Sequence, residues 1–237
     1  MPKLNINYKK PIVMSIGGSL IVPNGGPDVE FLRSLKKLID IQIKKGRRIV
    51  IVTGGGKTAR HYVHAAEALR PNKIASEDLD WLGIHATRLN GHLLRTIFRE
   101  VAHPIVIKNP TITPIRWKGK VLIAAGWKPG WSTDYVACRI AKRLGSSTVL
   151  NVSNVDHVYN IDPRKYKNAK PAEDMKWKDY RSIVGNEWSP VKSAPFDPVA
   201  SKFAHKNHME VAIIHGENMD NVQKLLDGKD FIGTILH

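Results

Sequence analysis

The chain has 237 residues, and its 37 Lys and Arg against 21 Asp and Glu give a formal net charge of +16. The length fits one domain or two closely joined lobes, and a hydrophobic content of 42% excludes a disordered chain. The single cysteine excludes an intrachain disulfide framework and fits a reducing cytoplasm, and no apolar run reaches the ~18 residues of a membrane span. The positive charge predicts a polyanionic partner, either nucleic acid or a phosphorylated small molecule.

The first hundred residues alternate short β-branched runs with helical periodicity. Glycines end the runs, and a proline followed by an acid opens the first long helix. In chain order the expected elements are a strand over Ile12–Ile16, a helix from Pro27-Asp28 that ends at Gly46, a strand over Arg48–Thr53, a helix over Lys57–Leu69, and a longer helix capped by Ser76 with an apolar face through Leu82, Leu89, Leu93 and Ile97.

The rest of the chain continues this alternation. The expected elements are strands at Ile105–Ile107 and Val121–Ala125, a helix capped at Ser132 or Thr133, a strand over Thr148–Val152, a ribbon-like segment over Val155–Asp162, helices near Lys178–Val184 and Pro198–His205, a strand at Val211–Ile214 and a helix at Asn218–Leu226. Such β/α alternation predicts an α/β fold, a three-layer αβα sandwich whose central sheet is largely parallel.

Two of the expected strand-to-helix turns are rich in glycine, namely Gly17-Gly18-Ser19 and Gly54-Gly55-Gly56-Lys57. Ligands of parallel sheets bind outside the carboxyl ends of the strands, and glycine lets the backbone approach a phosphate closely. One such turn alone is more often a plain tight turn, but two in one small sheet favour phosphate binding. The P-loop pattern fails because Ile51 stands where its first glycine belongs.

Two further segments carry residues suited to a ligand. The stretch Gly126–Asp134 combines glycines, Trp127 and Trp131, and hydroxyls at a helix N-terminus. Such a loop can hold a planar base and orient a phosphate or a cation, although ordinary N-capping explains Ser132–Asp134 equally well. The segment Asn154–Pro163 carries two acids and a tyrosine at ribbon spacing, which is unusual for an inert connector.

These four blocks, in this order, resemble the amino acid kinase family over essentially the whole chain, down to Gly233-Thr234-Ile235. Within the family, the chain is most similar to uridylate kinases of the archaeal type. Isopentenyl phosphate kinases usually have a histidine where Arg60 stands, which disfavours that substrate. The stretches that carry the subfamily resemblance are Gly55–Arg60, Asp80–Ile84 with Ala86–Asn90, and Pro129–Asp134.

The resemblance implies one amino acid kinase domain over residues 1–237, with an acceptor lobe over about 1–125 and an ATP lobe over about 126–237. It implies a cytoplasmic UMP kinase of pyrimidine nucleotide synthesis, which transfers the γ-phosphoryl group of ATP to UMP. Mg²⁺ is expected to be held mainly by the nucleotide phosphates and water, without a protein metal site. Family members often form hexamers, so a homo-oligomer is expected, with a dimer face on the helix of residues 76–100.

The family's functional positions carry over residue by residue. Those that hold ATP fall on Ser15, Ile16, Gly17, Gly18, Ser19, Gly56, Arg60, Ser153, Tyr159 and Asp162. Those that hold UMP fall on Gly55, Asp80, Trp127, Lys128, Pro129, Gly130, Trp131, Ser132 and Thr133. Those near the transferred phosphoryl group fall on Arg60, Lys57, Asp134 and Lys202.

The chain also departs from the family. Many members carry a lysine on the first strand, at a position near Met14-Ser15 here, and archaeal uridylate kinases lack it too. Lys57 and Lys202 are the candidates for its role. His157 replaces a usual glycine beside the adenosine positions, and the two tryptophans of the Gly126–Asp134 loop are bulkier than the usual residues.

Three other functions stay open. The chain can be a family kinase with a different phosphate or carboxylate acceptor, or a nucleotide- or oxyanion-binding homologue without catalysis, as the missing lysine allows. It can also be a nucleic-acid-binding regulator, which is disfavoured because the basic cluster Lys44–Arg48 has no aromatic residue and Arg164–Lys167 has a single one, Tyr166. The histidine pairs His61/His64 and His205/His208 are expected on solvated helix faces, and Cys138 in the core.

Overall fold

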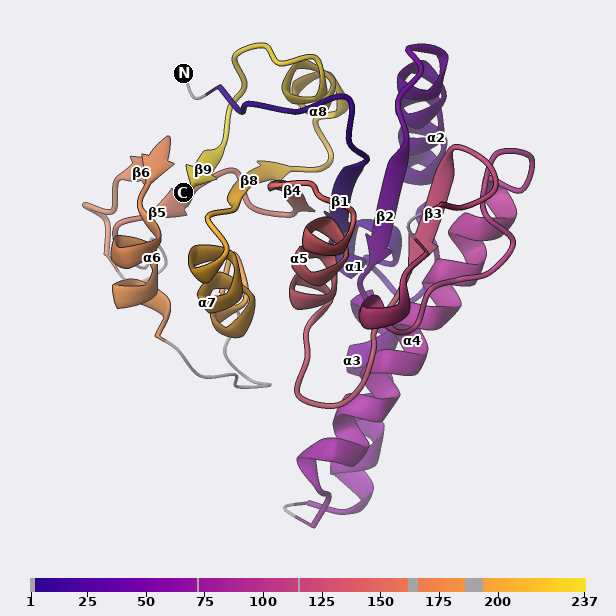
Figure 1. The fold of residues 1–237 in the computed structure, drawn as a ribbon. Helices are drawn as coiled ribbons and strands as arrows, with labels where there is room; N and C mark the ends of the chain where they lie inside the picture. The colour runs from indigo at the N-terminus through magenta and orange to yellow at the C-terminus, as the bar shows by residue number, and fades with distance from the viewer. Residues whose placement is uncertain (1–2, 72, 115, 162–165, 186–193) are drawn as a thin grey trace.

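The computed structural model describes residues 3–71, 73–114, 116–161, 166–185 and 194–237 (Figure 1). Among these residues, seven strands form one sheet in the order β3-β2-β1-β4-β8-β9-β7. The five strands from β3 to β8 run parallel, whereas β9 is antiparallel to β8. The bounds are β1 Ile12–Ile16, β2 Ile49–Thr53, β3 Val121–Ala124, β4 Thr148–Ser153, β7 Asp174–Met175, β8 Glu210–His215 and β9 Thr234–Leu236.

Helices cover both faces of this sheet, because each strand of the middle buries both of its faces. In β1, Ile12, Met14 and Ile16 pack on one face, and Val13 packs on the other. The first face is covered by α1, α2, α8 and the end of α4, and the second by α5, α6 and α7 (Figure 1). The bounds are α1 Gly18–Ile21, α2 Val29–Lys44, α3 Gly56–Leu69, α4 Ser76–Ile97, α5 Thr133–Arg143, α6 Trp177–Val184, α7 Pro198–Lys206 and α8 Met219–Leu226, with a 3₁₀ turn η1 at Pro110–Ile112.

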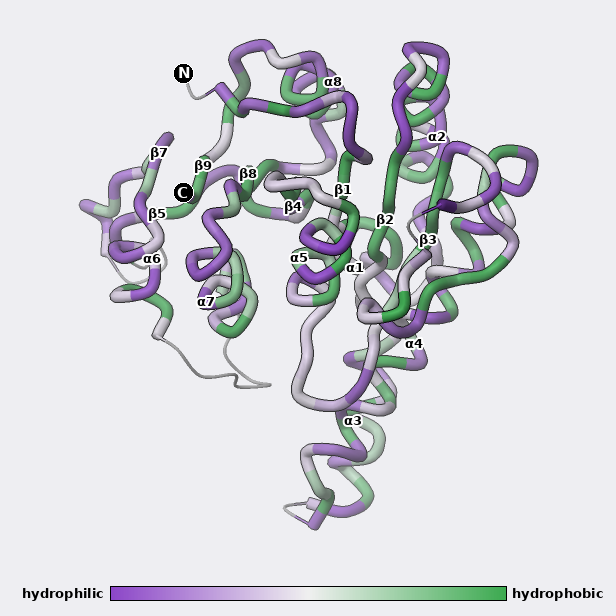
Figure 2. The backbone as a smooth tube through the Cα atoms, in the orientation of Figure 1, coloured by the Kyte–Doolittle hydropathy of each residue, from purple (hydrophilic) through white to green (hydrophobic). Residues whose placement is uncertain are grey.

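The predicted α/β sandwich is therefore confirmed, and so are most of its elements. The central strands are hydrophobic along their length, whereas the helices alternate hydrophobic and hydrophilic residues (Figure 2). The predicted cap Ser132 is present and accepts a hydrogen bond from the Tyr135 N–H at 3.1 Å. Asp28, which was expected to open its helix, is the N-cap and accepts one from the Phe31 N–H at 2.9 Å. Cys138 is fully buried, as expected.

Two predictions around α4 were wrong. Ser76 is the first helical residue, and the N-cap is Ala75, which has no side chain that can cap. The expected apolar face was wrong at Leu89, which is 63% exposed, whereas Leu93 and Ile97 of the same face pack against the core. The buried stripe passes instead through small and polar residues such as Gly91, because α4 lies so close to the sheet that a Cβ there would stand 3.3 Å from the Thr53 hydroxyl.

The expected strand at Ile105–Ile107 was also wrong. Only Ile107 forms an isolated bridge, to Ala124, and Ile105 is 64% exposed. β-branched residues favour strands only where a pleated surface buries them, and this loop runs along the edge of β3. The predicted ribbon-like segment contains β5 (Val158–Tyr159), but the sequence did not reveal its partner β6 (Pro171–Ala172), nor β9, which pairs with β8.

Helices α3 and α4 together project from one end of the sandwich (Figure 1). No described residue of α3 is buried, and the exposed side chains of Tyr62 and Leu69 lie on it. Within the described residues, no helix is long and apolar enough to cross a membrane.

Candidate active site

The carboxyl ends of the five parallel strands lie along one edge of the sheet. Strands β2 and β3 lie on one side of β1, and β4 and β8 lie on the other, so the chain order reverses between β1 and β4. The crevice at such a reversal is the usual ligand site of an open parallel sheet. Both predicted glycine turns begin here, at Gly17 after β1 and at Gly54 after β2.

The two glycine turns touch each other through their backbones. A Cβ on Gly18 would stand 2.0 Å from the Gly56 nitrogen, and a Cβ on Gly54 would stand 2.4 Å from the Gly18 nitrogen. Gly56 has a φ of +66°, and a Cβ there would stand 2.3 Å from the Gly18 oxygen. Contact between the turns, in addition to any ligand, therefore requires glycine at all three positions. We call these two turns, residues 17–19 and 54–56, the glycine junction.

Some backbone N–H groups of the glycine junction donate hydrogen bonds to neighbouring carbonyls, and others have no acceptor in the described residues. The Gly17 N–H donates to the Val152 carbonyl at 2.8 Å, and the Gly54 N–H donates to the Ile16 carbonyl at 2.9 Å. In the described part of the chain, no acceptor bonds the N–H groups of Gly18, Ser19, Gly55 and Gly56. Free amides beside the N-terminus of α3 form an anion-binding surface.

A buried polar cluster lies beside the glycine junction, where β1 meets β4. Ser15 on β1 and Asn151 on β4 are partners in the parallel register. Both donate hydrogen bonds to Oδ1 of Asp134, at 2.8 and 3.2 Å, and the Asp197 N–H donates to Oδ2 at 3.4 Å. Asp134 lies in the first turn of α5, so the sheet, α5 and α7 together fix its position.

Asp134 and Asp197 form a buried acid pair. Burial, together with the charge of Asp197, raises the pKa of Asp134 to about 6, and burial also raises the pKa of Asp197. Asp197 caps α7 through Oδ1, which accepts from the Ala200 N–H at 2.6 Å. Its Oδ2 is buried and has no hydrogen-bond partner, and no described Lys or Arg forms an ion pair with either acid. The pair can hold a proton near neutral pH.

Helix α4 holds the loop of residues 126–132, which we call the acceptor loop. Asp80 accepts a hydrogen bond from the Gly130 N–H at 2.8 Å. Arg88 donates to the carbonyls of Gly126 and Trp127, at 3.3 and 2.9 Å. Two charged side chains of one helix therefore hold the loop, at its start and at Gly130. The second carboxylate oxygen of Asp80 forms no hydrogen bond with the loop.

The predicted tryptophans of the acceptor loop form a row of aromatic rings. The ring centroids of Trp127 and Trp131 lie 5.9 Å apart, those of Trp131 and Tyr135 lie 4.1 Å apart, and those of Tyr135 and Phe203 lie 5.3 Å apart. Both tryptophans are half-buried against the core under α5. Their bulk therefore stiffens the loop as well as lining it.

The residues expected beside ATP lie on the β4 side of the same edge. Ser153 ends β4, and its buried hydroxyl has no hydrogen-bond partner in the described residues. A Cβ on Gly17 would stand 3.4 Å from the Ser153 Cα, so this strand end adjoins the glycine junction. Tyr159 is half-buried on β5, and Asp162 lies outside the described residues.

The three predicted cations have no ion-pair partner in the described part of the chain. Lys57 and Arg60 lie at the start of α3, and Lys202 lies on α7. Among the described residues, none of the three side chains forms an ion pair or hydrogen bond. Lys128 on the acceptor loop stands 4.7 Å above the Trp127 ring.

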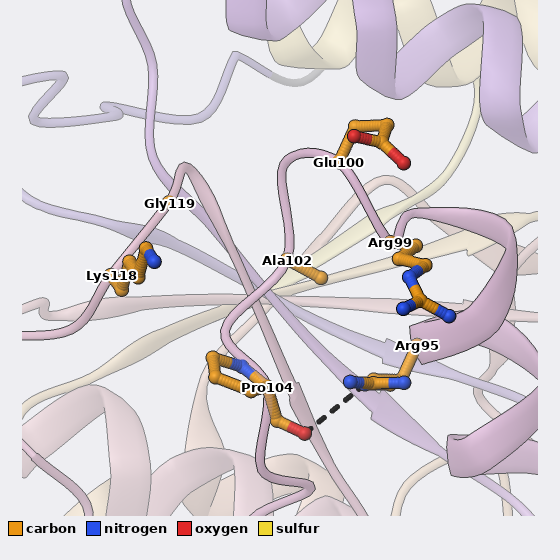
Figure 3. A pocket seen from close by; sticks show the side chains of 7 residues that line it. All are labelled: Arg95, Arg99, Glu100, Ala102, Pro104, Lys118 and Gly119. Carbon is orange, nitrogen blue, oxygen red and sulfur yellow. Dashed lines mark hydrogen bonds between the residues drawn. The ribbon is translucent and has the colours of Figure 1, made fainter.

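Two cavities lie away from this edge. One, of about 330 Å³, lies beside the amino end of β3, and Arg95 there donates to the Pro104 carbonyl (Figure 3). It is lined by Arg95, Arg99, Glu100, Ala102, Pro104, Lys118 and Gly119. The other, of about 380 Å³, lies between η1, α5 and α7. The candidate site is thus marked by backbone amides and converging polar groups, and the two cavities are separate features.

Residues 10–215 match the model of the amino acid kinase family. The chain belongs to the amino acid kinase family. The uridylate kinase of Pyrococcus abyssi is 35% identical over 223 residues, which cover 92% of this chain and 96% of that protein. The uridylate kinase of Thermococcus gammatolerans is 34% identical, with 95% of this chain and 98% of that protein covered.

Solved structures agree with this membership. The crystal structure of uridylate kinase from Archaeoglobus fulgidus has a TM-score of 0.78 at 26% identity, and covers 96% of this chain and 100% of that chain. The UMP kinase of Bacillus anthracis shares the fold, with a TM-score of 0.77 at 19% identity over 96% of each chain. The predicted family, its fold and the similarity to archaeal uridylate kinases are confirmed.

Sequence reasoning missed four polar residues of this amino acid kinase. Asn151 and Asp197 complete the cluster around Asp134, and Arg88 holds the acceptor loop. Asn90 donates to the carbonyls of Gly54 and Gly55, at 2.8 and 3.3 Å, and so braces the second glycine turn. Asn151 gave a usable signal, since it is a polar residue inside an apolar strand, whereas an aspartate before a proline is typical of a helix cap.

Proposed function

We propose that this chain is a UMP kinase, which transfers the γ-phosphoryl group of ATP to UMP and releases UDP and ADP. Similarity to uridylate kinases over nearly the full length of both chains carries the proposal. The geometry of the candidate site supports it. Phosphoryl transfer needs positioning and charge neutralisation more than covalent help, and the glycine junction offers free amides at the switch point of the sheet.

On the donor side, we propose that the glycine junction cradles the phosphates of ATP. The free N–H groups beside Ser15 and Ile16 at the end of β1 supply hydrogen bonds to phosphate oxygens. Ser153, Tyr159 and Asp162 are proposed to hold the adenosine. The unpartnered Ser153 hydroxyl, which adjoins Gly17, agrees with a ligand on this side.

On the acceptor side, we propose that Asp80 binds the ribose of UMP, and that Gly55 and residues 127–133 enclose its uracil and phosphate. One Asp80 oxygen already fixes the acceptor loop through Gly130, and the carboxylate has further lone pairs for the two ribose hydroxyls. The acceptor lobe of about residues 1–125 and the ATP lobe of about residues 126–237 would then meet at the switch point.

In the proposed reaction, an oxygen of the UMP phosphate attacks the γ-phosphorus, and the bond to the bridging oxygen of ADP breaks. A phosphate with a second pKa of about 6 is mostly ionised at neutral pH, so no general base is needed. Arg60, Lys57 and Lys202 are proposed to neutralise the charge that develops on the transferred oxygens. Asp134 acts as an organiser that holds Ser15 and Asn151 at the switch point.

We propose that Mg²⁺ arrives with ATP. The described residues contain no group of three or more His, Cys, Asp and Glu side chains that could hold a metal ion by themselves. Mg²⁺ keeps several waters and binds substrate phosphates in such enzymes, which fits this residue set. When bound, it would neutralise charge on the phosphates.

We propose that the protein is a cytoplasmic homo-oligomer, with a hexamer expected. The projecting helices α3 and α4 expose Tyr62, Leu69 and Leu89 at 64%, 85% and 63%. Exposed apolar side chains of this size on two neighbouring helices favour an interface over solvent. Light scattering coupled to gel filtration measures the mass, and a monomer at micromolar concentration would contradict this part of the proposal.

The decisive experiment incubates the protein with ATP and Mg²⁺ against UMP, CMP, dUMP, N-acetylglutamate and isopentenyl phosphate, and measures ADP. The proposal expects ADP to form faster with UMP than with any other acceptor. ADP with another acceptor alone would assign a different kinase of the family. No ADP with any acceptor, together with a melting shift from ATP, would assign a binding protein, since a ligand at 100 times its Kd adds about 2.7 kcal/mol.

A further inference from the structure

Three cations converge on the open cavity between η1, α5 and α7. Its volume is about 380 Å³, and it is lined by Pro110, Thr111, Arg139, Lys142, Arg143 and Phe203. No acid lines it. The cavity lies at the carboxyl end of α5, whereas the acceptor loop and Asp134 lie at its amino end. The cavity meets the aromatic row of the acceptor loop at Phe203, but its three cations are distinct from the residues proposed to bind UMP and ATP.

The partners of these cations are all uncharged. Arg139 donates to the Tyr135 hydroxyl at 3.2 Å, and Lys142 donates to the Asn207 side-chain oxygen. Arg143 donates to a backbone carbonyl at 2.6 Å. None of the three forms an ion pair with a described acid, so the cavity carries an uncompensated positive charge.

Helix electrostatics explain only part of this cluster. Lys142 and Arg143 lie in the last turn of α5, where cations complement the helix dipole. Arg139 lies one turn earlier and is held over the Phe203 ring, 5.5 Å from its centroid. Lys142 lies 5.7 Å from the same centroid. Like charges gathered around one ring repel each other, which favours an anion between them.

We propose that this cavity is a second anion site, which binds the phosphate groups of a small phosphorylated molecule. The volume lies in the range of small-molecule sites, about 300–1,000 Å³. Arginine offers a planar fork of donors that matches phosphate oxygens, and the contacts of Arg139 and Lys142 with Phe203 hold these side chains before a ligand arrives. Two sources share this chemistry, an inorganic polyphosphate and a nucleoside triphosphate whose base stacks on Phe203.

Lysine labelling by pyridoxal 5′-phosphate tests the site without reference to catalysis. The amine of a lysine adds to the aldehyde and water leaves, and borohydride then transfers hydride to the imine carbon and fixes the label. Peptide mass spectrometry of the full chain gives the rate at each lysine. We expect Lys142 to be labelled about ten times faster than Lys44, since a charge-assisted contact to the probe phosphate is worth about 1.4 kcal/mol. Lys44 is the matched control because it lies exposed in the last turn of α2.

Competition and substitution complete the test. Inorganic tripolyphosphate should protect Lys142 and leave Lys44 unprotected, and R139Q should slow labelling of Lys142 only. R143Q serves the same purpose should R139Q fail to fold. Pyridoxal without its phosphate should label both lysines equally. Stronger protection by a nucleoside triphosphate than by tripolyphosphate would assign the nucleotide, and equal protection the inorganic anion.

Three results would overturn the proposal. In the first, pyridoxal 5′-phosphate labels Lys142 no faster than Lys44. In the second, pyridoxal labels Lys142 as fast as pyridoxal 5′-phosphate does. In the third, a single-stranded oligonucleotide protects Lys142 and tripolyphosphate does not. The last result would assign the cluster to a nucleic-acid surface instead. Because UMP and turnover play no part here, failure of this proposal and failure of the proposed kinase activity are separate outcomes.

Discussion

The glycine junction and the acceptor loop lie along the same edge of the sheet, but different forces hold them in place. In the junction, backbones press against each other so closely that a Cβ on Gly18 would stand 2.0 Å from a main-chain nitrogen. In the acceptor loop, side chains of α4 hold the backbone, and a Cβ on Gly130 would meet nothing within 4 Å. The donor side is thus fixed by the fold itself, and the acceptor side by a few replaceable contacts.

This difference suggests where amino acid kinases can change their substrates. A change in the glycine junction alters the packing of α1 against α3 and so the folded state, whereas a change in the acceptor loop or in α4 alters only what the loop encloses. The largest effects on stability should therefore come from the junction, and the smallest and most specific effects on binding from the loop.

The largest expected effect is that of Gly18→Ala. The added methyl group must push one glycine turn away from the other, and such overpacking of backbone costs about 3–5 kcal/mol of unfolding free energy. Urea unfolding measures the loss. Gly26→Ala is the matched control, because a Cβ there meets nothing within 4 Å, and it should change stability by less than about 1 kcal/mol. Equal stability of the two variants would show that the junction is not tightly packed.

Arg60→Ala is expected to act on turnover and to spare stability. The side chain is exposed on α3 and forms no hydrogen bond or ion pair with a described residue, so we expect its removal to leave the fold intact. Loss of one cation beside the transferred phosphoryl group should lower kcat about 10²–10³-fold, with a smaller change in KM for UMP. Steady-state kinetics with UMP and ATP measure both constants.

Arg70→Ala is the control for this prediction, since Arg70 lies at the far end of the same helix. It should leave both constants unchanged. A rise in KM without a change in kcat for Arg60→Ala would place Arg60 in ground-state binding and remove it from the transfer step.

The sequence predicted the sheet and the glycine turns because both follow from local patterns. Buried parallel strands such as Arg48–Thr53 are continuous apolar runs, and glycine clusters mark the turns after them. It could not predict that the two turns touch, because that contact joins Gly18 to Gly56 across two strands and a helix. The site residues carried over from the family stay predictions, whereas the meeting of the two glycine turns and Ser153 at one edge follows from the parallel order of the strands.

For a similar reason, the sequence predicted only Ser15 and Asp134 of the polar cluster and missed its other members. Its members lie on β1, α5, β4 and the cap of α7, so no spacing along the chain connects them. The expected apolar face of α4 was wrong at Leu89, because close approach to the sheet places the small residues Gly91 and Thr87 against it instead. Hydrophobicity predicts which residues are buried at ordinary distances, and small polar residues replace them where elements approach more closely.

The buried acid pair gives the next prediction, a stability that falls with pH. The pKa of Asp134 lies at about 6, above its ordinary value of 3.8, so the folded state binds the proton more tightly than the unfolded state. Its contribution to stability is complete below pH 3.8 and is lost as the pH rises through about 6. The difference between a pKa of 3.8 in the unfolded state and about 6 in the folded state corresponds to about 3 kcal/mol.

Asp197→Asn should reduce this loss. Asparagine keeps the cap of α7 but removes the neighbouring charge, so the pKa of Asp134 moves down toward its ordinary value. Urea unfolding between pH 4.5 and 7.5 compares wild type with the variant, and Asp134→Asn shows the background from other groups. An equal loss of stability with pH in all three proteins would show that the acid pair does not titrate in this range.

The smallest expected effect, and the most specific, is that of Asp80→Asn. The amide oxygen can still accept from the Gly130 N–H, so the acceptor loop keeps its position while the charge is lost. Hydrogen bonds to a charged group are about twice as strong as those to a neutral one, and the loss of about 1.4 kcal/mol should raise KM for UMP about tenfold. Both kcat and the unfolding free energy should stay close to wild type.

Asp78→Asn controls for the lost charge, because Asp78 is exposed in the first turn of α4 and should have no effect on KM. A fall in unfolding free energy for Asp80→Asn, as large as that for Gly18→Ala, would mean that the acceptor loop is as much a part of the fold as the glycine junction. A change in KM alone would instead show that one side chain can adjust acceptor binding while the donor side stays fixed, because only the junction is built from main-chain contacts.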